Sequence, residues 1–228
     1  MVFAYRFVGY LGLLSVLGAL LFGFRHDPGA PWSNYLFNIG LYLAWALVHL
    51  LMTSDTFKRI VYGARTGSLI ERQVYIMVTV ITWLGVLWLH RAVPGPSHLF
   101  SEPIRFTATI GFLFGVVGFF EGATFASLDS FLGVPGATLS HAHSPETPLL
   151  TGGQYAQVRH PMYRAATGAA VCTLFLHCHL SQLLWSLMIG ATFIFFIPIE
   201  EGRLIAARGD AYRAYMQAVP WRLLRGVW

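Results

Sequence analysis

The sequence contains four long segments without a single Asp, Glu, Lys or Arg. They run from Phe7 to Phe24, from Pro28 to Ser54, from Gln73 to His90, and from Phe106 to Phe120, the last continuing past Glu121 to about Leu128. A hydrocarbon core of about 30 Å is crossed by a helix of roughly 20 mostly apolar residues, because a helix satisfies its own backbone hydrogen bonds in lipid. Each segment is therefore predicted to be a transmembrane helix.

A fifth apolar run, from Ala165 to Ile199, is too long for one crossing and is interrupted by the polar sequence HCHLSQ at 177–182. We interpret it as a helical hairpin with short arms at 165–177 and 182–198. The prediction is an all-α integral membrane protein with about six transmembrane segments, the last two forming the hairpin. It is a single domain over residues 1–228, with four segments in 1–128 and a loop, the hairpin and a C-terminal tail in 129–228.

The composition supports this class, because 56% of the residues are hydrophobic and only 11% are charged. A soluble domain carries about 25% charged residues. With six crossings both termini lie on one side, which also receives twelve of the fifteen Lys and Arg residues; Arg25, Arg91 and Arg105 fall on the other. The positive-inside rule then predicts cytoplasmic termini. Topology and contact with the lipid bilayer account for the net charge of +5, so no nucleic-acid partner is expected.

Two polar motifs flank the hairpin on the predicted cytoplasmic side: VRHPMYR at 158–164 and EEGRLIAARGDAYRAYMQAVP at 200–220. Pro161 is typical of a first helical turn, where free N–H groups and the helix dipole, together with Arg159, favour an anion. Glu200 and Glu201 require a cation at a membrane boundary. A ligand with a carboxylate and a cationic group satisfies both motifs, and S-adenosylmethionine has this pattern.

The same motifs resemble the C-terminal signature of membrane-integral methyltransferases of the isoprenylcysteine carboxyl methyltransferase and phospholipid methyltransferase type. That signature is R-H-P-x-Y-x-G, then E-E, then G-x-x-Y-x-x-Y-x-x-x-V-P; its last part matches at Gly209, Tyr212, Tyr215, Val219 and Pro220. The sequence departs from it at Arg164-Ala165. The resemblance implies a cytoplasmic pocket for S-adenosylmethionine. The cofactor-binding candidates are Arg159, His160, Pro161, Tyr163, Glu200, Glu201 and Tyr212.

The N-terminal half resembles NnrU-like membrane proteins and the related methanethiol S-methyltransferases. The matching residues are His49, Met52, Phe57, Lys58, Arg59, Glu71, Arg72 and Tyr75, with Asp129 in SLDSFLGV at 127–134. The resemblance implies methyl transfer to a small lipophilic acceptor, first of all a thiol such as methanethiol. A prenylcysteine carboxylate or a phospholipid amine is the second possibility. An NnrU-like haem-binding or accessory membrane protein is an alternative of another class.

Three residues are catalytic candidates: His49, which could take the proton of a thiol, Asp129 and Arg72. Structural alternatives stay open for them: a neutral histidine hydrogen-bonded between helices, a helix cap, and a partner of Glu71. Arg159 and His160 could instead contact lipid phosphates, Tyr163 could anchor the interface, and the two glutamates could pair with Arg203 or Arg59.

Two H-x-H pairs, His141/His143 and His177/His179, are predicted to lie on opposite sides of the membrane. They therefore cannot form one four-ligand site, and no metal is expected. No predicted segment carries an acid or a base at its centre, which argues against a transporter.

Overall fold

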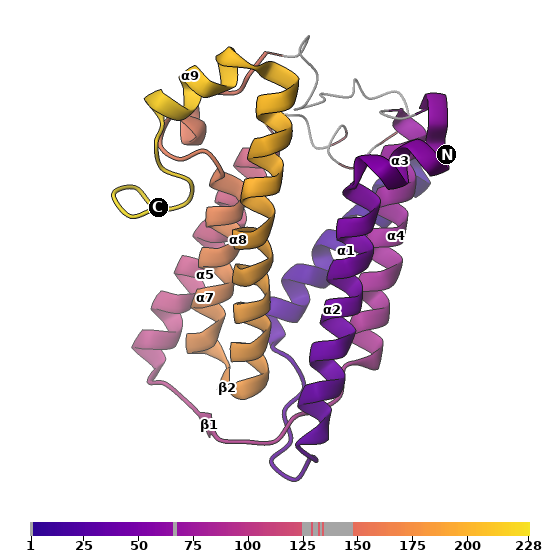
Figure 1. Ribbon diagram of the computed structural model, residues 1–228. Helices are drawn as coiled ribbons and strands as arrows, with labels where there is room; N and C mark the ends of the chain where they lie inside the picture. Colours follow the sequence, from indigo (N-terminus) through magenta and orange to yellow (C-terminus); the bar gives the residue numbers. More distant parts are fainter. Residues whose placement is uncertain (1, 66–67, 125–128, 130–131, 133, 135–147) are drawn as a thin grey trace.

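The computed structural model describes residues 2–65, 68–124, 129, 132, 134 and 148–228, and this part of the chain is mostly helical (Figure 1). The helices are α1 (Val2–Phe22), α2 (Ser33–Thr53), α3 (Asp55–Tyr62), α4 (Leu69–Leu89), α5 (Glu102–Thr124), α7 (Pro161–Leu176), α8 (Leu180–Arg208) and α9 (Asp210–Ala218), with short 3-10 turns η1 (Gly63–Arg65) and η2 (Gly153–Ala156). Two-residue strands β1 (Ser97–His98) and β2 (Cys178–His179) pair antiparallel.

Four helices are long and apolar enough to cross a membrane: α2, α4, α5 over Glu102–Gly122, and α8. This supports an all-α integral membrane protein. Two further apolar helices are shorter. In α1 the apolar stretch covers Arg6–Phe22, and α7 has 16 residues.

The predicted hairpin is present, but its second arm is longer than expected. α7 ends at Leu176 and α8 begins at Leu180, so the turn falls at the start of HCHLSQ. The predicted end of the second arm at residue 198 is wrong, because α8 continues to Arg208 with Pro198 inside it. A proline inside a helix removes one backbone hydrogen bond and its ring crowds the carbonyl four residues earlier, yet α8 continues through Pro198, whose side chain is exposed. Glu200 and Glu201 consequently lie within a continuous helix.

The long helices form two groups, α1 with α2 and α4, and α5 with α7 and α8 (Figure 1). In the second group glycines of α5 face small or flexible side chains of α7: a Cβ at Gly111 would lie 2.7 Å from Cys172 Sγ, and one at Gly122 would lie 2.6 Å from Met162 Cγ. Small residues allow helix backbones to approach closely, which is how helices associate in lipid.

The two groups meet through aromatic side chains. The ring of Trp185 on α8 lies 4.8 Å from that of Trp83 on α4 and 5.1 Å from that of Tyr42 on α2, measured between ring centroids. Phe24, which follows α1, lies 4.8 Å from the same Trp185 ring. These contacts join the groups on the side of the molecule where β1 and β2 lie.

The two ends of the molecule differ in charge. Arg25, Arg91 and Arg105 belong to the end that carries β1 and β2, and the other twelve of the fifteen Lys and Arg residues belong to segments toward the end with the N-terminus, α3 and α9 (Figure 1). The structure thus separates these side chains along the helix axes as the sequence predicted.

Candidate functional site

A cavity of about 1450 Å³ lies between the two helix groups. At the end with α3 and α9 its walls are polar and include Lys58, Arg72, Arg159, His160, Glu200 and Arg203. Deeper between the helices its walls are apolar and include Leu13, Val16, Leu17, Leu20, Trp83 and Met188. A ligand in this cavity would place its polar part near the basic end and its apolar part between the helices.

One polar wall is built around the carboxylate of Glu201, whose side chain is 4% exposed. Its Oε1 accepts hydrogen bonds from Arg159 Nε at 2.7 Å and from His160 Nε2 at 3.1 Å. Its Oε2 lies 3.0 Å from both Nε and Nη2 of Arg222. Three side chains, with four donor nitrogens, therefore satisfy both oxygens of this buried carboxylate, as a buried charge requires.

The same wall contains the C-terminal tail. The backbone N–H groups of Arg159 and His160 donate to the carbonyls of Trp221 and Arg222 at 2.8 and 3.0 Å. Arg159 Nη1 donates to the carbonyls of Val219 and Pro220 at 2.9 and 2.7 Å. The segment before α7 is thus fixed to the tail by main-chain and side-chain hydrogen bonds together.

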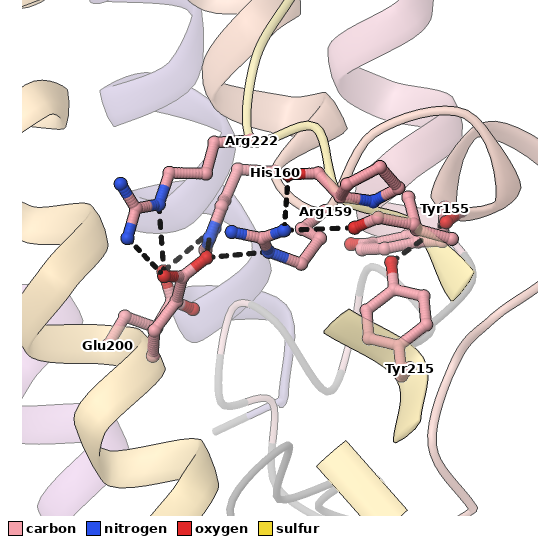
Figure 2. A network of polar contacts seen from close by, with 9 residues as sticks. Tyr155, Arg159, His160, Glu200, Tyr215 and Arg222 are labelled. Atoms are coloured by element: carbon pink, nitrogen blue, oxygen red, sulfur yellow. Dashed lines mark hydrogen bonds and ion pairs between the residues drawn. The ribbon is translucent and has the colours of Figure 1, made fainter. Parts of the chain in front are cut away.

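The α9 helix is tied to the segment before α7 as well. The hydroxyl of Tyr215 donates to the carbonyl of Tyr155 at 2.8 Å (Figure 2). Tyr212 and Tyr215 pack with Leu204 of α8 in a small buried cluster. Burial raises the pKa of both tyrosines, so their hydroxyls stay protonated at neutral pH.

His160 connects the buried carboxylate to Glu200. Its Nδ1 lies 3.5 Å from Oε2 of Glu200, while its Nε2 contacts Glu201. Burial alone would lower the pKa of His160, but the hydrogen bonds and the negative charges of Glu200 and Glu201 outweigh it and raise the pKa. Only the doubly protonated ring can donate toward both carboxylates, so this arrangement favours an imidazolium.

The start of α7 supplies backbone donors to the cavity. Pro161 occupies its first turn, and the first helical hydrogen bond runs from Arg164 N to His160 O at 3.0 Å. The N–H groups of Met162 and Tyr163 precede this bond and have no intrahelical acceptor. Both residues line the cavity, so the predicted anion-binding feature is at the cavity wall.

Two aromatic rings extend this wall. The ring of Tyr163 stacks on that of Phe193 of α8, with centroids 4.4 Å apart and planes 15° apart. The Tyr163 ring also lies nearly parallel to that of His160, with centroids 5.5 Å apart and planes 7° apart. These flat surfaces can hold a planar or cationic ligand group.

The opposite wall carries the predicted catalytic residues of α2 and α4. The ring of His49 lies 4.2 Å from Trp45 and 5.5 Å from Tyr75. Arg72 has its guanidinium carbon 5.9 Å from the centre of the Tyr75 ring. His49 and Arg72 both line the cavity. Glu71, the alternative partner of Arg72, forms an ion pair of 2.9 Å with Lys58.

The structure brings most of the candidates together. Six line the cavity on the side of α7 and α8: Arg159, His160, Pro161, Tyr163, Glu200 and Tyr212. Glu201 lies behind this wall. Asp129 forms a two-pronged ion pair with Arg6 at 2.6 and 3.1 Å, and the hydrogen bond with Arg6 lowers the pKa of Asp129. Neither Asp129 nor Arg6 is among the residues that line the cavity, so this ion pair suits an anchor between α1 and the segment after α5.

Sequence reasoning missed three contributors to this site: Arg222, Tyr155 and Phe193. Arg222 pairs with Glu201, a role for which the sequence suggested Arg203 or Arg59. The feature that could have identified Arg222 is its position two residues after Pro220, where the tail signature ends. Tyr155 and Phe193 carried no motif that distinguishes them from the other aromatics of the chain.

Only one of the two H-x-H pairs lies within the described residues. His177 and His179 lie at the end with β1 and β2, and His141 and His143 are outside the described residues. Among the described residues no group of three or more His, Cys, Asp or Glu side chains is arranged to hold a metal ion.

No family model, no curated protein and no solved structure matches this chain. The functional interpretation therefore depends on the residues and on the geometry of the cavity.

Proposed function

We propose that the chain is an integral membrane methyltransferase that transfers a methyl group from S-adenosylmethionine to a lipophilic acceptor. One observation carries the proposal: a single cavity brings the start of α7, Glu200 and the Tyr163–Phe193 stack on one wall opposite His49 on the other. The separation of Lys and Arg residues supports six membrane segments, with the termini and the polar end of the cavity in the cytoplasm.

The residues of the cavity fit the chemical groups of this cofactor. The free N–H groups of Met162 and Tyr163, next to the cationic His160, would hold its carboxylate. Glu200 would meet its ammonium or sulfonium charge, and the rings of Tyr163 and Phe193 offer a flat surface to its adenine. The cavity of about 1450 Å³ exceeds the roughly 300–1,000 Å³ of a usual ligand pocket, which leaves room for an acceptor beside the cofactor.

The chain has three tasks in such a reaction. When bound, the cofactor supplies a methyl group already activated by a positively charged sulfur. The protein positions the acceptor in line with that group, which contributes up to about 7–11 kcal/mol in well-oriented systems. The apolar walls keep water away, and His49 is placed on the opposite wall to accept the proton that a thiol must lose before it attacks.

The first acceptor we propose is a small thiol such as methanethiol. The shape of the cavity also supports a second class, a prenylcysteine carboxylate or a phospholipid amine. The lining of α8 reaches from Glu200 to Trp185, and fifteen residues of helix at 1.5 Å each extend about 22 Å. An apolar depth of this length suits an acceptor with a hydrocarbon chain.

Cofactor binding tests the proposal directly. S-adenosylmethionine or S-adenosylhomocysteine at 100 times its dissociation constant should stabilise purified protein by about 2.7 kcal/mol, because a ligand of the native state shifts the unfolding equilibrium. An unchanged unfolding temperature at saturating cofactor would overturn it. Incubation with methyl-labelled cofactor and a panel of thiols, prenylcysteines and phospholipids then identifies the acceptor. A strong Soret absorption band in the purified protein would instead support the haem-binding alternative.

A further inference from the structure

The adjacent carboxylates of α8 have opposite environments. The side chain of Glu200 is 31% exposed and lines the cavity, whereas that of Glu201 is 4% exposed and lies behind the wall. A carboxylate accepts about four hydrogen bonds. Glu201 uses this capacity on Arg159, His160 and both Nε and Nη2 of Arg222.

We propose that Glu201 is a positioning residue that contacts no ligand, and that Glu200 is the carboxylate that meets the cationic group of the ligand. The assignment to a ligand cation rests on the proposed function, and the positioning role stands on the contacts alone. The two neighbouring glutamates, which the sequence does not distinguish, thus have separate tasks.

Glu201 acts through the C-terminal tail. It orients the guanidinium of Arg159, whose Nη1 holds the carbonyls of Val219 and Pro220. It also holds Arg222, whose guanidinium carbon lies 5.2 Å from the centre of the terminal Trp228 ring. Loss of the Glu201 charge leaves the buried Arg159 and the half-buried Arg222 without their carboxylate, so the tail is expected to detach from the start of α7.

The protonation state of His160 affects both glutamates, because its ring contacts each of them. It faces Glu200 and Glu201 from α8 and the ring of Tyr163 from α7. Other ionisable groups of this wall include Tyr155, Tyr212, Tyr215, Arg159, Arg203 and Arg222. A neutral imidazole has one N–H and can donate to only one of the two carboxylates. Deprotonation of His160 therefore removes a positive charge from beside Glu200, which changes the net charge at this wall of the cavity. The affinity for a ligand should then depend on pH.

The first arm of the test uses no ligand. Amide hydrogen exchange is measured on the full chain in detergent, in the peptides that cover 219–228. Glu201→Gln should exchange faster there than wild type, while Glu200→Gln and the exposed far-end control Glu102→Gln should not. Arg222→Gln, which leaves Arg159 and His160 paired with Glu201, should release the tail even if Glu201→Gln fails to fold. Unchanged tail protection in Arg222→Gln, or in a folded Glu201→Gln, would overturn the positioning role.

The second arm measures the affinity for S-adenosylmethionine as a function of pH. Glu200→Gln should lose at least about tenfold in affinity, the equivalent of 1.4 kcal/mol, with normal tail protection. In Glu201→Gln the midpoint of the pH dependence should move to lower pH, because His160 keeps only one carboxylate, and Glu201→Asp should restore part of the shift. Wild-type affinity in Glu200→Gln, or an unmoved midpoint, contradicts the assignment. If wild type binds no cofactor while Arg222→Gln releases the tail, the proposed function and the role of Glu200 fail and the positioning role of Glu201 stands.

Discussion

Gly115 of α5 faces the backbone of α7 at Ala165 with no room for a side chain. A Cβ at Gly115 would lie 2.9 Å from the carbonyl oxygen of Ala165 and 2.9 Å from the Cβ of Ala169. Such a contact requires the helices to move, because a backbone atom cannot give way as the end of a side chain can. Arg159 and His160 directly precede α7 and Tyr163 lies in its first turn, so this packing also positions the candidate site.

We therefore expect Gly115→Ala to destabilise the protein by about 1–3 kcal/mol, the usual cost of overpacking. Gly168→Ala on α7 is the matched control, because a Cβ there meets nothing within 4 Å. Alanine favours a helix over glycine by about 0.8–1.0 kcal/mol, so the control should be neutral or stabilising. Thermal unfolding in one detergent measures both variants. Equal unfolding temperatures for the two would show that α5 and α7 are not packed this closely.

The sequence predicted where the helices lie along the chain far better than which sides of them pack against other helices. Uncharged runs identify apolar helices because their length and composition are dictated by the bilayer, and HCHLSQ marked the turn before α8. The sequence did not predict the rotation of each helix about its own axis, because lipid-facing and interior-facing sides are equally apolar. On α2, Leu43 is 54% exposed and Tyr42 is 2% exposed, and no pattern of polarity separates them.

In the candidate site, too, the sequence predicted which segments come together but not which side chains pair. The motifs at 158–164 and 200–220 predicted that the start of α7 and Glu200–Glu201 come together, since a hairpin joins them. The second arginine that pairs with Glu201, besides Arg159, could not be identified from the sequence, because Arg203, Arg208, Arg213, Arg222 and Arg225 all follow Glu201. The fold of the tail selects Arg222, and that fold depends on contacts with Arg159, far away in the chain.

His49 gives a prediction that separates catalysis from binding. It lies on α2, across the cavity from the residues proposed to hold the cofactor. His49→Ala should therefore leave the dissociation constant of S-adenosylmethionine unchanged. Loss of a general base typically lowers the turnover number about 10²–10⁴-fold, and we expect a decrease in this range with a thiol acceptor. His98→Ala, an exposed histidine at the other end, is the control. Normal turnover in His49→Ala would assign this residue to packing with Trp45.

The histidines at the end with β1 and β2 predict a loss of stability in acid. Burial, followed by the positive charge of Arg25, lowers the pKa of His90 to about 4. Burial, followed by the neighbouring His26 and His177, lowers the pKa of His179 to about 4. Both rings use a nitrogen as an acceptor: His90 Nε2 lies 3.2 Å from the Asn38 amide nitrogen, and His179 Nδ1 accepts from Gln182 N at 3.2 Å. Protonation would remove both hydrogen bonds.

A histidine with a lowered pKa stabilises the fold above the ordinary pKa of 6.5, and this contribution is lost as the pH falls from 6.5 toward 4. For the buried His90 the contribution is of the order of 3 kcal/mol. The unfolding temperature should therefore fall between pH 6.5 and pH 4, and it should fall less steeply in His90→Gln, which cannot take up the proton. His98→Gln should keep the wild-type slope, because His98 is exposed. Parallel curves for His90→Gln and wild type would show that His90 does not resist protonation in the folded protein.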